Sequence, residues 1–198
     1  LVLAGGAESM SGAPHLLRHH RQGRKYGNST VEDSIQVDGL TDPLLHISMG
    51  ETAERVAQRY GLTREQQDAW AARSQQRAVA ARADFSREMA AVETGFGPVE
   101  TDEHPRPDTT PERLARIKPA FRPDGTVTAG NSSGINDGAA ALLLAGEAAL
   151  PAGGLTSRAR IVGACTTGCE PELMGLGPIG AIRRLCAELD WGLDSVDA

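Results

Sequence analysis

Aromatic side chains and positive charge are both scarce in this 198-residue sequence. Phe, Trp and Tyr make up 4% of it, and the formal net charge is −6. A protein dedicated to nucleic acid would show a surplus of basic residues and aromatic rings on which bases stack. We therefore expect no nucleic-acid partner.

Long apolar runs are absent as well. No stretch reaches the roughly 20 apolar residues that a membrane-spanning helix needs, and no charged and then apolar leader opens the sequence. The sequence predicts neither membrane insertion nor secretion, and we expect a folded cytoplasmic protein.

Cysteine is rare, and its spacing fits no familiar framework. The three residues, Cys165, Cys169 and Cys186, match neither a disulfide scaffold nor a zinc ribbon. We interpret them as reduced residues of the core, and no metal site is predicted.

Signals of a natural start and stop are missing too. The chain opens without Met in the apolar run Leu1–Ala4 and stops at Ala198 without a cap or a polar tail. This pattern is typical of an internal piece of a longer protein. Such a piece, with open sheet edges, is expected to be poorly soluble alone.

Two long helices are predicted in the first half of the chain. Apolar positions recur with helical spacing over 51–60, and Gly61 follows as a C-cap. Thr63 and Gln66 form a capping box that starts a second helix, which runs to about Arg87. The side chains expected on the buried faces are Ala53, Val56, Ala57 and Tyr60 in the first helix and Trp70, Ala78, Ala81 and Phe85 in the second.

Two further helices begin at prolines. Thr110 precedes Pro111 at the first helical position of a short helix. Pro178 opens an amphipathic helix. Its expected apolar side is formed by Ile179, Ile182, Leu185, Cys186 and Leu189.

Three apolar segments, at residues 1–6, 139–145 and 160–165, are expected to be buried strands. Periodicity alone leaves a helix open for the second of them. Strands that alternate with helices predict a parallel α/β sheet. The polar and basic segment His15–Gly27 is typical of an exposed loop.

Reactive side chains are few. Acyl transfer needs a nucleophile, a base and oxyanion donors. Cys165 and Cys186 lie in apolar patterns that suit a buried thiol better than a reactive one, whereas the position of Cys169 after Gly168 leaves exposure open for that residue. His46 also lies among apolar residues, and we interpret it as a core imidazole rather than a catalytic one.

Two local features favour ligand binding. The prolines on both sides of Arg106 make a stiff segment after His104, which would hold the arginine in a fixed direction. The loop Gly130–Gly138 offers backbone amides and hydroxyls that suit an extended ligand chain. A surface charge and an ordinary turn are the plainer interpretations of the same residues.

Several runs of residues resemble the thiolase family in order and spacing. The longest is Gly125–Ala140, which reads GTVTAGNSSGINDGAA, and the resemblance covers essentially the whole chain. The shorter runs are Gly5–Ser11, Gly39–Asp42, Met49–Glu54 and Thr101–Glu103.

The resemblance implies an α/β fold, the thiolase fold, in which two similar halves stack as an αβαβα layered sandwich with an inserted loop domain. Only part of that fold would be represented here. Residues 1–9 would be a strand of the N-terminal half, residues 10–135 the loop domain, residues 136–150 the last strand of that half and residues 151–198 the start of the C-terminal half.

Ligand contacts are implied residue by residue. Arg106 would lie near the adenine and phosphate end of coenzyme A, and Ser133 would touch the pantetheine arm. Leu40 and Met49 would form an apolar wall near the acyl end. Short-chain relatives carry His where this chain has Ser48, a departure that leaves acyl chain length open and favours a broader 3-ketoacyl-CoA enzyme of fatty acid β-oxidation.

The activity implied by the resemblance is thiolysis of a 3-ketoacyl-CoA, or the reverse Claisen condensation, through a Cys acyl-enzyme. Coenzyme A and acyl-CoA would be the substrates, with no further cofactor, and the complete protein would form a dimer or tetramer. The family's catalytic residues are expected outside these 198 residues, which would be inactive alone. The alternative is a noncatalytic module for CoA binding or oligomerisation.

Overall fold

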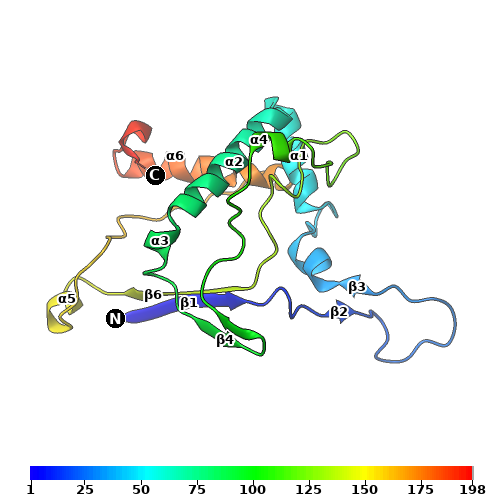
Figure 1. Cartoon of the computed structure of the whole chain (residues 1–198), viewed down its shortest axis with the longest axis horizontal. Coiled ribbons are helices and arrows are strands. Elements are labelled where there is room, and N and C mark those ends of the chain that lie inside the picture. The colour runs from blue at the N-terminus through cyan, green and yellow to red at the C-terminus, as the bar shows by residue number, and fades with distance from the viewer. Residues whose placement is uncertain (198) are drawn as a thin grey trace. The chain divides into compact units, whose positions relative to one another are not determined.

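The computed structural model describes residues 1–197, which divide into two compact units. The first unit contains residues 1–48 and the residues from 136 onward, and the second contains residues 49–135. Figure 1 labels most of the helices and strands of both units. The assignment of segments to thiolase halves and an inserted loop domain stays a prediction.

An antiparallel ribbon of two strands is the main element of the first unit. β1 (Val2–Glu8) pairs with β6 (Gly138–Leu144) along its whole length (Figure 1). The two backbones approach closely at Gly5, where a Cβ atom would lie only 2.5 Å from the carbonyl oxygen of Ala140. At the end of the ribbon, the backbone amide of Ser11 donates a hydrogen bond of 2.8 Å to Asp137.

The strands predicted at residues 1–6 and 139–145 are thus confirmed, but three expectations about them are wrong. Every sheet in residues 1–197 is antiparallel. Both strands are exposed along their length. Residues 160–165 form no strand, because an apolar run without a neighbouring strand has no partner for its backbone groups.

The rest of the first unit consists of short elements and one longer helix. The segment His15–Gly27 is mostly irregular and exposed, as predicted. α6 confirms the helix expected at Pro178, although its apolar side is not buried, with Ile182 48% exposed. The elements are β2 (His15–Leu16), β3 (Glu32–Asp33), a π-helical turn (Ile35–Gly39), α5 (Ala149–Ala152), two 3-10 turns (Pro171–Leu176 and Leu193–Ser195) and α6 (Gly177–Glu188).

Two helices form the frame of the second unit. Gly61, with φ +62°, separates them, and the predicted capping box at Thr63 and Gln66 is present. The second helix ends earlier than predicted, because a short helix follows it as a separate element. The elements are α1 (Met49–Tyr60), α2 (Arg64–Ala80), α3 (Arg82–Phe85), the hairpin strands β4 (Val92–Thr94) and β5 (Gly97–Val99), and α4 (Pro111–Leu114).

The buried faces of α1 and α2 differ from those expected. Of the predicted apolar positions only Ala57 is fully buried, whereas Trp70 is 68% exposed. Ala72 is also buried, but polar residues take the other buried positions, above all Glu54 and Asp68. They are buried because each has hydrogen-bond partners in the loop at 126–131.

The predicted core positions of His46 and the cysteines are also wrong. His46 is exposed in a turn with φ +56°. All three cysteines are free, but Cys169 is exposed and the other two are only half-buried. Their apolar sequence neighbours are themselves largely exposed, so these segments provide no core for them.

An ion pair between α1 and the turn at 122–125 makes the stability of the second unit depend on pH. Arg122 donates hydrogen bonds of 2.8 and 2.5 Å to the carboxylate of Glu51. These bonds hold the pKa of Glu51 below its ordinary value of 4.5. A lowered pKa in the folded state means that the stabilisation is present above the unfolded pKa and is lost as the pH falls through the folded pKa.

We therefore expect the Glu51→Gln variant of the full-length protein to lose about 1 kcal/mol of unfolding free energy at neutral pH. Below the folded pKa the difference from the wild type should vanish, because the carboxyl group is then protonated in both states of the wild type. Denaturant unfolding from about pH 7 to about pH 3 measures this. A difference in unfolding free energy between the wild type and Glu51→Gln that stays constant with pH would contradict the role of the ion pair. The exposed substitution Glu103→Gln is the control.

Candidate functional site

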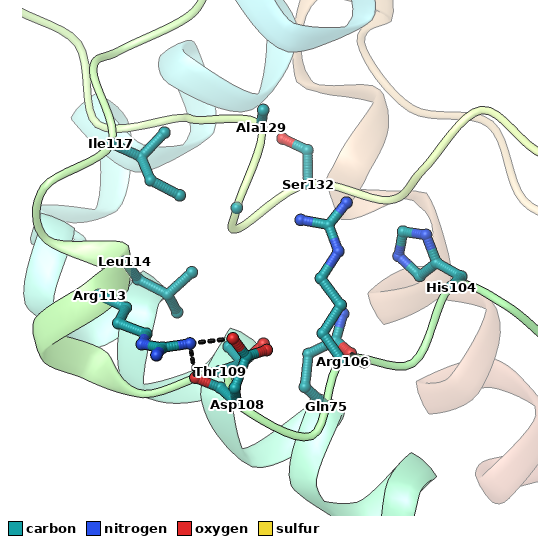
Figure 2. Close-up of a pocket in the computed structure, with 11 residues that line it drawn as sticks. Gln75, His104, Arg106, Asp108, Thr109, Arg113, Leu114, Ile117, Ala129 and Ser132 are labelled. Carbon is teal, nitrogen blue, oxygen red and sulfur yellow. Dashed lines mark hydrogen bonds and ion pairs between the residues drawn. The ribbon is translucent and has the colours of Figure 1, made fainter.

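A cavity of about 170 Å³ lies wholly within the second unit (Figure 2). Three of its lining residues carry basic side chains: His104, Arg106 and Arg113. A basic cavity can attract an anionic ligand, and its walls raise the local concentration of such ligands.

Arg106 is held by its backbone and leaves its charge available. Its amide donates a hydrogen bond of 2.7 Å to Oε1 of Gln75 on α2. Its carbonyl accepts a hydrogen bond of 3.3 Å from the amide of Thr109. Within residues 1–197 its guanidinium makes no hydrogen bond or ion pair, and Figure 2 shows it extending toward Ser132. An unpaired guanidinium of this kind is a strong donor for a phosphate or carboxylate.

Arg113 differs because it has a partner in the cavity wall. Nη1 of Arg113 pairs with the carboxylate of Asp108 and donates a hydrogen bond of 3.1 Å to the Asp108 carbonyl (Figure 2). Thr110 begins α4 by accepting a hydrogen bond of 3.3 Å from the Arg113 amide, as its sequence predicted. The positive charge of Arg113 is therefore balanced within the chain.

The apolar side of the cavity depends on close packing around a glycine. Leu114 and Ile117, from α4 and the turn after it, lie against Gly130 in the glycine-rich loop. A Cβ on Gly130 would lie 2.5 Å from Cδ1 of Ile117 and 2.6 Å from Cδ2 of Leu114. Any larger residue at this position would push the loop away from α4.

Hydrogen bonds within the glycine-rich loop fix its conformation. The amide of Thr128 donates a hydrogen bond of 2.7 Å to Oδ1 of Asn131. In return, the hydroxyl of Thr128 accepts a bond of 3.2 Å from the Asn131 amide. Thr128 is fully buried, so these bonds are shielded from water.

Two buried carboxylates connect this loop to the helices. Glu54 on α1 accepts hydrogen bonds from the amides of Thr126 and Val127 at 2.9 and 2.8 Å. Asp68 on α2 accepts a bond of 3.0 Å from the side chain of Asn131. Sequence patterns gave no sign of either carboxylate, since their partners lie far away along the chain.

The structure places only one of the four predicted binding residues on the cavity wall. Arg106 lines it, whereas exposed Ser133 lies one residue beyond the lining residue Ser132. Met49, half-buried, begins α1 and is not part of the lining. Leu40 is half-buried in the other unit and is not among the lining residues.

Gln75 and Asp108 line the cavity but were not among the predicted site residues. Each acts by holding an arginine, and a sequence offers no signal for such a contact. Within residues 1–197 no group of three or more metal-ligating side chains is placed to hold a metal ion. No helix in that range has the length and apolar character to cross a bilayer.

Sequence comparison finds relatives along the whole chain. Residues 1–148 match the family profile described as thiolase, N-terminal domain. The chain is 45% identical to an acetyl-CoA acetyltransferase of Pseudomonas aeruginosa and 43% identical to the human mitochondrial 3-ketoacyl-CoA thiolase. Each alignment covers 100% of the chain and 52% and 51% of those relatives, so the chain spans about half their length.

Two solved structures are similar to this chain over 98% of its length. Human mitochondrial 3-ketoacyl-CoA thiolase in complex with CoA superposes with a TM-score of 0.91 at 43% identity, over 98% of this chain and 50% of that one. The Bacillus anthracis acetyl-CoA acetyltransferase gives a TM-score of 0.89 at 42% identity, over 98% and 51%.

Proposed function

This chain belongs to the thiolase family and has part of the thiolase fold, and from that premise we propose that the protein transfers acyl groups to and from coenzyme A. The reaction is thiolysis of a 3-ketoacyl-CoA or the reverse Claisen condensation, with the acyl group carried on a cysteine sulfur. The observation that carries this proposal is the cavity that presents the unpaired guanidinium of Arg106.

The cavity suits one end of a CoA molecule. CoA is anionic at its nucleotide end, which matches the charge of Arg106, and the adenine ring can rest on the apolar side chains of Leu114 and Ile117. A volume of about 170 Å³ holds only part of such a ligand. One similar structure was solved with CoA bound, which supports the choice of ligand.

The remaining predicted contacts extend this proposal along the ligand. Ser133, next to the cavity residue Ser132, contacts the pantetheine arm. Leu40 and Met49 form the apolar wall around the acyl chain. The substitution of Ser48 for the histidine of short-chain relatives keeps longer 3-ketoacyl groups among the substrates.

The residues of this chain bind and orient the substrate rather than react with it. The thiols of Cys165 and Cys169 lie 4.0 and 3.9 Å from backbone carbonyl oxygens, and no thiol in residues 1–197 hydrogen-bonds to a histidine. A thiol that takes part in acyl transfer needs a base within hydrogen-bond reach to accept its proton. We place the nucleophile and its base outside these 198 residues.

Replacing Arg106 with alanine in the full-length protein tests the ligand site. We expect the KM for CoA to rise about tenfold with little change in kcat, because the lost contact binds the unreactive end of the ligand equally in the ground and transition states. Steady-state thiolysis of acetoacetyl-CoA measures both constants. Exposed Arg116→Ala, which changes a nearby arginine outside the cavity, is the matched control.

Two results would count against these proposals. A fall in kcat with an unchanged KM would remove Arg106 from the CoA site. Absence of both thiolysis and condensation in the full-length protein would exclude the acyltransferase.

A noncatalytic CoA-binding module is the second candidate. One observation favours it: every residue that lines the cavity lies within residues 49–135. The two candidates are distinguished by calorimetry and kinetics on the same sample of full-length protein. CoA binding without turnover of any 3-ketoacyl-CoA supports the module.

The proposal also covers the oligomeric state and the cellular location of the protein. We expect the full-length protein to form a dimer or tetramer. A cytoplasmic location is supported by the three free cysteines, which persist in reducing compartments.

A further inference from the structure

Two arginines line one cavity, but only one of them is available to a ligand in this structure. Arg106 has no partner for its guanidinium within residues 1–197, whereas Arg113 is paired with Asp108. Figure 2 shows Arg113 turned toward Asp108, while Arg106 extends past them toward Ser132. The cavity therefore contains one available positive charge and a second that is neutralised.

The Arg113–Asp108 pair is exposed enough to exchange partners. The side chains are 60% and 67% exposed, and ion pairs in contact with water contribute little net stability. Both groups can be rehydrated when the pair separates. An anion that enters the cavity can thus take the place of Asp108 at low cost.

The charge of that anion decides whether the exchange occurs. Asp108 carries a single negative charge, and so does each phosphate of a diphosphate bridge, which gives the bridge no electrostatic advantage over the carboxylate. A phosphate monoester carries roughly 1.5 to 2 negative charges near neutral pH and offers three acceptor oxygens. A guanidinium binds such a group with two parallel hydrogen bonds.

We propose that Arg113 is a specificity-determining residue that binds the 3′-phosphate monoester of CoA, and that Asp108 is the internal competitor which this phosphate displaces. The inference rests on the proposed function, because it takes CoA as the ligand. It assigns different roles to the two arginines: Arg106 binds the diphosphate region, and Arg113 distinguishes CoA from 3′-dephospho-CoA.

Calorimetric titration of the full-length protein with CoA and with 3′-dephospho-CoA tests this assignment. The wild type should bind CoA about tenfold more tightly than 3′-dephospho-CoA. Arg113→Gln should reduce this preference to about twofold or less without changing the Kd of 3′-dephospho-CoA. Asp108→Asn should act in the opposite direction and tighten CoA binding by about threefold or more, because the competitor is removed.

Matched controls come from α4 and the residues just after it. Glu112→Gln removes an exposed carboxylate that does not line the cavity, and Arg116→Gln removes an exposed guanidinium just after α4. Both variants should keep the wild-type preference for CoA. If Arg113→Gln misfolds, Asp108→Asn still tests the proposal, since no general loss of structure would tighten binding.

The possible failures are distinguishable. If Arg113→Gln weakened the binding of both ligands equally, or changed the affinity for neither, the proposed role of Arg113 would be wrong and the acyltransferase proposal would stay intact. Failure of Asp108→Asn to tighten CoA binding would exclude Asp108 as a competitor. If the wild type bound neither ligand, the proposed CoA site itself would be wrong.

Discussion

Glu54→Ala is expected to lower the unfolding free energy of the second unit by about 3–5 kcal/mol. The Glu54 side chain is buried and accepts hydrogen bonds from the amides of Thr126 and Val127 and from the Thr126 hydroxyl, at 2.8 to 3.0 Å. Alanine would leave these donors without an acceptor where water has little access. Buried donors without a partner each cost about 1–3 kcal/mol.

The effect should be visible residue by residue. Hydrogen exchange in the full-length protein is expected to accelerate at the amides of residues 126 and 127, because both lose their acceptor. Glu54→Gln should lie between alanine and the wild type, since its amide keeps one acceptor oxygen but directs an NH₂ group at the donors. Glu103→Ala, at an exposed position, is the control. Unchanged exchange at 126 and 127 would show that other contacts hold the loop.

The helix starts of this protein could be predicted because the signals are local. Thr63 is followed three residues later by Gln66, and their reciprocal hydrogen bonds form within one turn. Thr110 with Pro111, and Pro178, mark two further starts in the same way. Such signals do not depend on the rest of the fold.

The buried faces could not be predicted because they depend on distant partners. Glu54 lies 73 residues from Val127, and Asp68 lies 63 residues from Asn131. An apolar pattern cannot identify a buried carboxylate whose partners are not yet placed. Trp70 shows the opposite error: its ring is largely exposed, with the Arg73 guanidinium stacked 4.1 Å from its centroid.

The direction of strand pairing could not be predicted for the same reason. The apolar composition of residues 1–6 and 139–145 predicted two strands, but their antiparallel direction depends on the path of the long segment between them. Within the site, the flanking prolines drew attention to Arg106, and the family resemblance assigned it to the ligand. Gln75 was missed because its contact is to the backbone of Arg106, and a backbone amide carries no sequence signal.

Replacing Asp68 should destabilise the second unit as much as replacing Glu54. It should also weaken ligand binding, because Asp68 links both sides of the cavity. Its Oδ2 accepts a hydrogen bond of 2.8 Å from Nε of Arg64. The same guanidinium donates bonds of 2.6 and 2.9 Å to the carbonyl oxygens of Leu114 and Ile117. The other oxygen of Asp68 holds Asn131 in the glycine-rich loop.

Asp68→Ala is therefore expected to cost about 3–5 kcal/mol of unfolding free energy, because it leaves the charge of Arg64 partly buried without its partner. The KM for CoA should rise about tenfold or more, since α4 and the loop lose their common anchor. Denaturant unfolding and steady-state kinetics of the full-length protein measure the two effects, with exposed Asp84→Ala as the control.

A double variant separates the charge from the shape. Arg64→Met combined with Asp68→Leu removes both charges and keeps apolar volume, so it should be less destabilised than Asp68→Ala alone. The KM should nevertheless stay raised, because neither Leu114 nor Asn131 regains its hydrogen bond. A double variant with normal KM would show that packing alone positions the cavity walls, and the proposed link through Asp68 would then be wrong.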